Sequence, residues 1–163
     1  MRIAILGAFL ALTLSAQTIS VSQIELNTRQ PEKPLAELWS VAARNPKSAA
    51  ARVEVGFAHL SLHRLQQAEW AARESLEIDP ANARGQLLLG WTLARQYRYT
   101  SEALDSLRRA AHTYPEAHLG AADVLAHQGS VNEARVEVEA YLASGDAEFR
   151  KIAESWLRLL GAD

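Results

Sequence analysis

The stretch LEIDPANARGQLLLGW, from Leu76 to Trp91, ends one helical pattern and begins another within a few residues. The first pattern is interrupted at Pro80, and the second restarts at Asn82. Proline has no N–H and its ring clashes inside a helix, so Pro80 ends the first helix, whereas the first turn of the next helix tolerates it. The side-chain oxygen of Asn82 can cap that second helix. The stretch therefore predicts a tight junction between two helices.

The same junction recurs along the chain. Pro46, Pro80 and Pro115 each follow a helical pattern, and their spacings are 34 and 35 residues. A period of this length indicates stacked repeats. Each proline precedes two helical patterns joined by a short link, which predicts antiparallel helix pairs. The predicted pairs are 49–63 with 65–78, 82–96 with 100–113, and 116–128 with 131–143.

These units resemble the tetratricopeptide repeat (TPR) family, whose signature is W-x2-L-G-x2-Y…A-x3-F…P. The residues that carry the resemblance are Arg52, Val55, Gly56, His59, Ala68, Ala72 and Pro80 in the first unit, Gln86, Leu89, Gly90, Leu93, Ala103, Leu107 and Pro115 in the second, and His118, Ala121, Ala122, Leu125, Ala134 and Val138 in the third. The first aromatic position is not aromatic in any unit, and the third unit has no closing proline. The resemblance implies an all-α fold, a right-handed superhelical stack of antiparallel helix pairs, over residues 34–161.

Small residues mark where the helices of a pair are expected to cross, because helices approach closely only where side chains are short. We expect Gly56 to lie against Ala68, and Gly90 against Ala103. The full units span 47–80, 81–115 and 116–145.

Partial elements flank the three units. Residues 35–44 (LAELWSVAAR) read as the second helix of a worn first unit. Residues 147–160 form an amphipathic pattern, with Asp146 as a candidate cap, and predict the C-terminal capping helix that a solenoid needs to cover its last apolar face.

The first sixteen residues have the layout of a secretory signal peptide. A charged start is followed by twelve mostly apolar residues, Ile3–Leu14, and then by Ala16, after which we expect cleavage. A membrane-spanning helix needs roughly 20 apolar residues. The segment therefore predicts an exported protein, periplasmic or extracellular, with no stable membrane span after cleavage. The alternative is a buried first helix.

Residues 17–33 belong to neither the signal nor the repeats. TISVSQIEL, residues 18–26, alternates polar and apolar side chains over part of its length. It is either a flexible linker or an extended segment that docks elsewhere.

Composition excludes several functions. The formal net charge is −2, with 17 basic and 19 acidic residues, so no basic excess indicates nucleic-acid binding. Cysteine is absent, and no phosphate-binding or dinucleotide glycine motif is present. His59 and His63 share a helix face but have no third ligand at a convincing spacing. Asp123, His127 and Ser130 lack a nucleophile turn. We therefore predict no catalysis, no cofactor and no metal.

The remaining candidate is a binding surface. The first helix of each pair lines a concave groove in TPR arrays, and the resemblance implies that this groove binds proteins or peptides. The expected groove residues are Val53, Phe57, Leu60, Arg84, Leu87, Leu88, Trp91, Arg95, Leu119 and Asp123. Several of these, Leu88 included, read alternatively as inter-helix core. The lysine and asparagine groups with which some members of the family clamp carboxylates are not matched here.

Trp91 is the expected anchor of this surface. It follows Leu89-Gly90, and one further residue turns the side chain by about 100°, away from the paired helix. Arg84 and Arg95 fall on nearly the same stripe. Replacing Trp91 is therefore expected to weaken partner binding and to leave the fold nearly intact.

Two functions follow from these observations. The first is a non-catalytic adaptor of the cell envelope that binds a protein or peptide partner in a mostly apolar groove. The alternative is a structural subunit whose groove is filled by self-association, as a homo-oligomer, or by the chain's own N-terminal segment.

Overall fold

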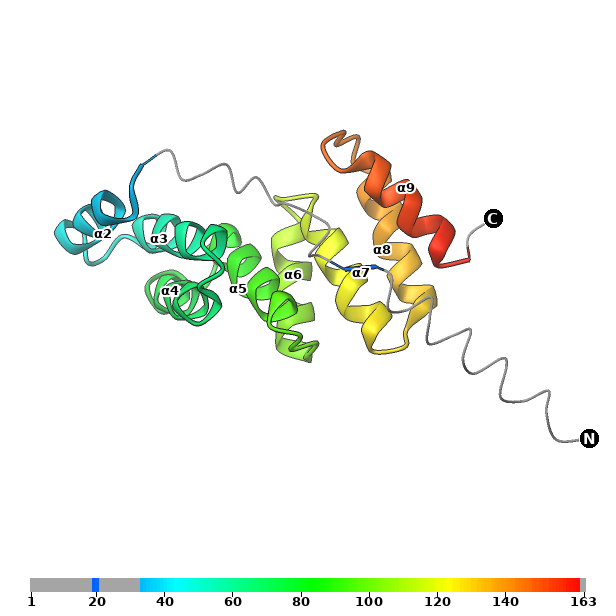
Figure 1. Cartoon of the computed structure of the whole chain (residues 1–163), viewed down its shortest axis with the longest axis horizontal. Coiled ribbons are helices and arrows are strands. Elements are labelled where there is room, and N and C mark those ends of the chain that lie inside the picture. The colour runs from blue at the N-terminus through cyan, green and yellow to red at the C-terminus, as the bar shows by residue number, and fades with distance from the viewer. Residues whose placement is uncertain (1–18, 21–32, 162–163) are drawn as a thin grey trace, which may run out of the picture.

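The computed structural model describes residues 19–20 and 33–161. Within these ranges the chain forms helices and no strand (Figure 1). The helices are α2 (Leu35–Arg44), α3 (Ala49–Ser61), α4 (Leu65–Ile78), α5 (Ala83–Arg95), α6 (Ser101–Ala111), α7 (Ala117–His127), α8 (Val131–Ala143) and α9 (Arg150–Leu159). The expected signal peptide and most of the segment 17–33 lie outside the described residues.

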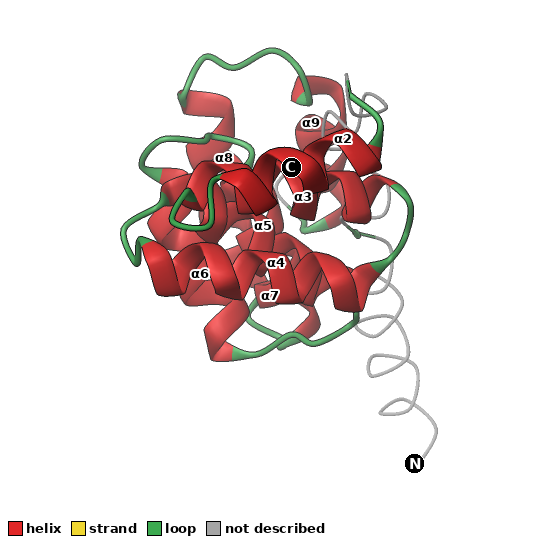
Figure 2. Cartoon of the chain, turned by 90° about the vertical axis from the view of Figure 1, so that its left-hand side faces the viewer, coloured by secondary structure: helices red, strands yellow, loops and turns green. Residues whose placement is uncertain are grey.

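Helices that follow one another in the chain pack side by side. The pairs α3/α4, α5/α6 and α7/α8 form the repeat units, α2 packs on α3, and α9 packs on α8. Contacts between units join α4 to α5 and α6 to α7, and the first helices α3, α5 and α7 also contact one another in series. Figure 2, which views the molecule from the α2 end, shows how the helices gather around α5. The predicted all-α stack of helix pairs with a C-terminal covering helix is confirmed.

The helix bounds agree closely with the sequence pattern. Three helices, α2, α4 and α8, have the predicted bounds, and the others are shorter by one to three residues at an end. Asn82 caps α5 as expected, because its side-chain oxygen accepts a hydrogen bond from the N–H of Gly85. The prediction of Asp146 as the cap of the last helix is wrong. Asp146 instead accepts hydrogen bonds from the Tyr141 hydroxyl and from the N–H of Glu148.

The turn inside each pair has one recurring geometry. At the end of each first helix, one residue adopts a positive φ: His63 at 55°, Tyr97 at 58° and Gly129 at 82°. The backbone N–H of the residue that follows donates a hydrogen bond of 2.9 Å to the carbonyl five residues before it, as Arg98 does to Leu93. This shared closure shows that the three units are equivalent in structure as well as in spacing.

The glycines of the first helices lie where neighbouring helices come closest. A Cβ placed on Gly90 would lie 3.0 Å from the Ala103 carbonyl oxygen and 2.5 Å from Leu107 Cγ, so the predicted contact between Gly90 and Ala103 is confirmed. The nearest atoms to a Cβ on Gly56 belong to Leu88 and Ala71, not to Ala68 as expected. Gly56 therefore accommodates a side chain of the next unit as well as its own partner helix.

Replacing Gly90 with leucine should destabilise the fold. The added side chain would overlap Leu107, at a cost of about 1–3 kcal/mol from overpacking, partly offset by the better helix propensity of leucine. The free energy of unfolding, measured by chemical denaturation, checks this. Ala50→Leu is the control, because Ala50 is exposed on α3. Equal stability of the two variants would show that α5 and α6 do not approach closely at Gly90.

Candidate functional site: the concave face

The candidate site is the face shared by α3, α5 and α7, the first helices of the three pairs. Its central helix is covered on every side. All residues from Gly85 to Ala94 are buried, and in α7 so are Ala117 and all residues from Leu119 to Ala126. A helix with an open concave side would expose a stripe of side chains. The described part of α5 shows no such stripe except at its two ends, where Arg84 is exposed and Arg95 half-buried.

The structure places the ten expected groove residues in three environments. Seven are buried, namely Val53, Leu60, Leu87, Leu88, Trp91, Leu119 and Asp123. Phe57 and Arg95 are half-buried, and Arg84 is exposed. The expectation that these side chains line an open groove is therefore corrected for most of them. Leu60, Leu87, Leu88, Trp91 and Leu119 belong to one hydrophobic core that spans the units. Their part in binding a partner stays a prediction.

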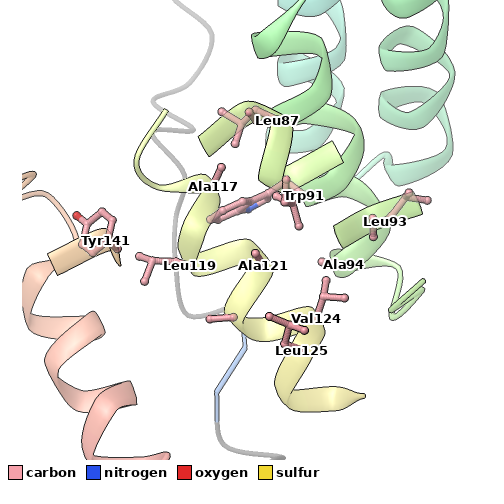
Figure 3. Packing of buried hydrophobic residues seen from close by; sticks show 14 of the residues in the cluster. Leu87, Trp91, Leu93, Ala94, Ala117, Leu119, Ala121, Val124, Leu125 and Tyr141 are labelled. Atoms are coloured by element: carbon pink, nitrogen blue, oxygen red, sulfur yellow. The ribbon is translucent and has the colours of Figure 1, made fainter. Parts of the chain in front are cut away.

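The burial of Trp91 is the most important of these corrections. Its side chain is 0 % exposed, and Figure 3 shows its ring directed towards α7. A Cβ placed on Gly120 would lie 2.9 Å from the Trp91 ring, so the glycine leaves the space that the indole occupies. Leu107 of α6 reaches the same glycine, at 2.7 Å from that Cβ position. The Trp91 side chain therefore points at the first helix of the next unit rather than at solvent.

The accessible part of the face lies between α3 and α5. The Arg84 guanidinium sits 5.1 Å from the centre of the Phe57 ring and forms a salt bridge with Glu54. The Glu54 and Arg84 side chains are nearly half exposed. This rim of Glu54, Phe57 and Arg84 combines an aromatic surface with charges of both signs, and Phe57 packs against the apolar core.

A second polar group stands at the other end of the face. His127 Nδ1 lies 2.9 Å from the Asp123 carbonyl oxygen and 3.1 Å from its buried carboxylate, and the His127 ring stacks on Tyr99 at 4.0 Å. The side-chain hydrogen bond with Asp123 raises the pKa of His127 above its usual value, although burial opposes this. The group fixes the end of α7 against the turn after α5. Ser130, the third residue of the triad considered from the sequence, caps α8 without a side-chain hydrogen bond.

A polar contact that was not predicted from the sequence repeats between units. Arg73 of α4 hydrogen-bonds Glu102 of α6 at 2.6 Å, and Arg108 of α6 hydrogen-bonds Glu137 of α8 at 2.9 Å. Both pairs are separated by 29 residues, and each member recurs after 35. Burial raises the pKa of Glu137, but hydrogen bonds from His118 and Arg108 outweigh it and hold that pKa below its usual value. The signal available in the sequence was an arginine and a glutamate, 29 residues apart, that both recur after 35 residues.

The histidines considered as metal ligands have structural positions. His59 is buried against the edge of the Trp39 ring, and its burial, with the nearby Arg64 charge, lowers its pKa. His63 occupies the turn with positive φ. Among the described residues, no group of three potential ligands is placed to hold a metal ion. No described helix has both the length and the apolar character needed to cross a membrane.

Comparison with known proteins identifies the fold. No protein-family model and no curated protein matches the sequence. Among solved structures, the chain is similar to the crystal structure of a thermophilic TPR protein from Thermus thermophilus, with a TM-score of 0.68 and 20 % sequence identity. The match covers 90 % of this chain and 89 % of that chain. At this identity the likeness shows the fold, and the predicted TPR-like solenoid is confirmed.

Replacing Trp91 with alanine should now destabilise the protein, contrary to the expectation from the sequence. Loss of a fully buried indole leaves a cavity between α5 and α7 and should cost about 3–5 kcal/mol. Trp70→Ala is the matched control, because Trp70 is 49 % exposed on α4, where its ring contacts that of Trp39. It should cost about 1 kcal/mol or less. Chemical denaturation followed by circular dichroism measures both, and similar losses would place Trp91 at the surface.

Proposed function

We propose that this chain is a non-catalytic adaptor that binds an extended protein segment across the first helices of its repeats. The observation that carries the proposal is the rim of Glu54, Phe57 and Arg84 beside an apolar face. Solenoids of stacked helix pairs create long concave surfaces of this kind. The fold alone does not fix a function, so the rim residues have to supply the recognition.

The chemistry of the rim indicates the kind of partner. Phe57 offers an aromatic surface, and Arg84 holds its charge over that ring at 5.1 Å. Aromatic residues and arginine contribute most of the binding energy in protein interfaces. Glu54 neutralises Arg84 in the free protein, so an acidic group of the partner has to compete with Glu54 for the guanidinium. The surface suits a segment with an apolar side chain for Phe57 and a carboxylate for Arg84.

The binding role of Phe57 can be tested with the chain beginning at Gln17, immobilised and exposed to the envelope fraction of the native host. A specific partner should be retained by the parent and about tenfold less by Phe57→Ala, which corresponds to a loss of about 1–2 kcal/mol. Trp70→Ala removes an exposed aromatic from α4, which is outside the concave face, and should retain the partner as the parent does. Equal retention by all three proteins would exclude the rim as the binding surface.

Export is the second part of the proposed function, and it rests on the sequence of residues 1–16. A charged start, a short apolar run and a small residue at position 16 are typical of cleaved secretory signals. The mass of the protein isolated from its native host should correspond to a chain that begins at Gln17. Recovery of a soluble form that retains Met1 would contradict export.

A further inference from the structure

One residue from outside the repeats lies in the hydrophobic core. Ile19 is 0 % exposed and belongs to the same core cluster as Leu87, Trp91 and Leu119. In Figures 1 and 3 the short blue trace of residues 19–20 runs beside α7. The other described residues before α2 are Ser20, Lys33 and Pro34, and none of them is in the core. The N-terminal segment therefore contributes an aliphatic side chain to the interior of the stack.

The burial of α5 and α7 agrees with this position. The helices that contact α5 most extensively are α3, α4, α6 and α7, all from the helix layers themselves. The concave side of a first helix in a stack of pairs has no helix to cover it. Nevertheless, Leu87 and Leu119 are at most 3 % exposed, and Ile19 shares their cluster. Ile19, which belongs to no helix, contributes to this cover.

The sequence around Ile19 suits such a segment. Ile19 and Ser20 are neither helical nor paired in a strand. The stretch from Ile19 to Leu26 places branched aliphatic residues at alternate or nearly alternate positions. β-Branched residues favour extended backbone, in which alternate side chains point to the same side. The fifteen residues 20–34 link Ile19 to α2 and can reach at most roughly 50 Å when extended.

We infer that the concave face is a binding site for an extended aliphatic segment and that the chain's own residues 17–30, anchored by Ile19, are its resident occupant. This inference rests on the proposed function, because both place the binding site on the concave face. It differs in the ligand, which is the chain's own segment and not a partner protein. A partner that uses the same face has to displace the segment. The tether holds the segment at a high effective concentration, so the partner's apparent affinity is lowered until displacement occurs.

The test uses the chain from Gln17 onward, which contains every described residue. Ile19→Asp places a carboxylate in a fully buried position, which should expel the segment because an unpaired charge is costly to bury. The helices should remain folded, since Ile19 belongs to none of them. A synthetic peptide of residues 17–30 should then bind the Ile19→Asp protein at least tenfold more tightly than the parent, as measured by calorimetric titration.

Two controls make the result specific. Val136→Asp makes the same kind of change at a 59 % exposed position on α8, and this protein should bind the peptide as weakly as the parent does. The peptide that itself carries Ile19→Asp should bind none of the proteins. If Ile19→Asp prevents folding, Ile19→Ala replaces it, with peptide binding again tighter than in the parent. Equal peptide binding to parent and variant, or no binding to either, would overturn the inference.

The outcomes also separate this inference from the adaptor function. If the peptide binds the Ile19→Asp protein but no envelope protein depends on Phe57, the segment is a structural part of the fold and the adaptor function fails. If an envelope protein depends on Phe57 while the peptide binds neither protein, the adaptor function stands and the resident segment is excluded. Tighter capture of that envelope protein by Ile19→Asp than by the parent would support both.

Discussion

The helices of this protein can stack because glycine opens a space at each place where a large side chain from a neighbouring helix has to enter. Leu88 enters at Gly56, Leu107 at Gly90, and Trp91 at Gly120. Each of these contacts would be closer than 3.0 Å if the glycine carried a Cβ. Gly56 and Gly120 receive side chains from a different repeat unit, so they join units as well as helices. The continuous core from α3 to α9 depends on these interlocking contacts.

Polar contacts then fix how one unit meets the next. The ion pairs of Arg73 with Glu102 and of Arg108 with Glu137 repeat the same pairing of residues one unit apart. Gln96 and Gln128 each follow a first helix and donate a side-chain hydrogen bond to a carbonyl of the preceding unit. The acceptor is the Leu65 carbonyl for Gln96 and the Tyr99 carbonyl for Gln128. An exposed ion pair such as that of Arg73 with Glu102 contributes little to stability on its own. The value of these contacts is positional, because apolar packing alone would tolerate small shifts of one unit along the other.

The helices could be predicted from the sequence, but the contacts between units could not. The proline period, the Asn82 cap and the contact of Gly90 with Ala103 are local features, and each was predicted from residues close together in the chain. Trp91 shows the limit of this reasoning. Its position on α5 follows from the helix period, but the neighbour of its side chain depends on how the next unit is rotated, and that neighbour is α7. The buried Ile19 was left open for the same reason, since an alternating pattern predicts an extended segment without naming the surface that it meets.

The position of Ile19 also sets an order of events when the chain folds. Every helix pair is closed by contacts within about 35 residues, and such local contacts form fast. Ile19 lies at the opposite end of the chain from α7, α8 and α9, whose side chains share its core cluster. The loop that joins Ile19 to them is long, and its closure entropy has to be offset by an already assembled surface. We therefore expect Ile19 to reach its place last, after the stack of helices has assembled.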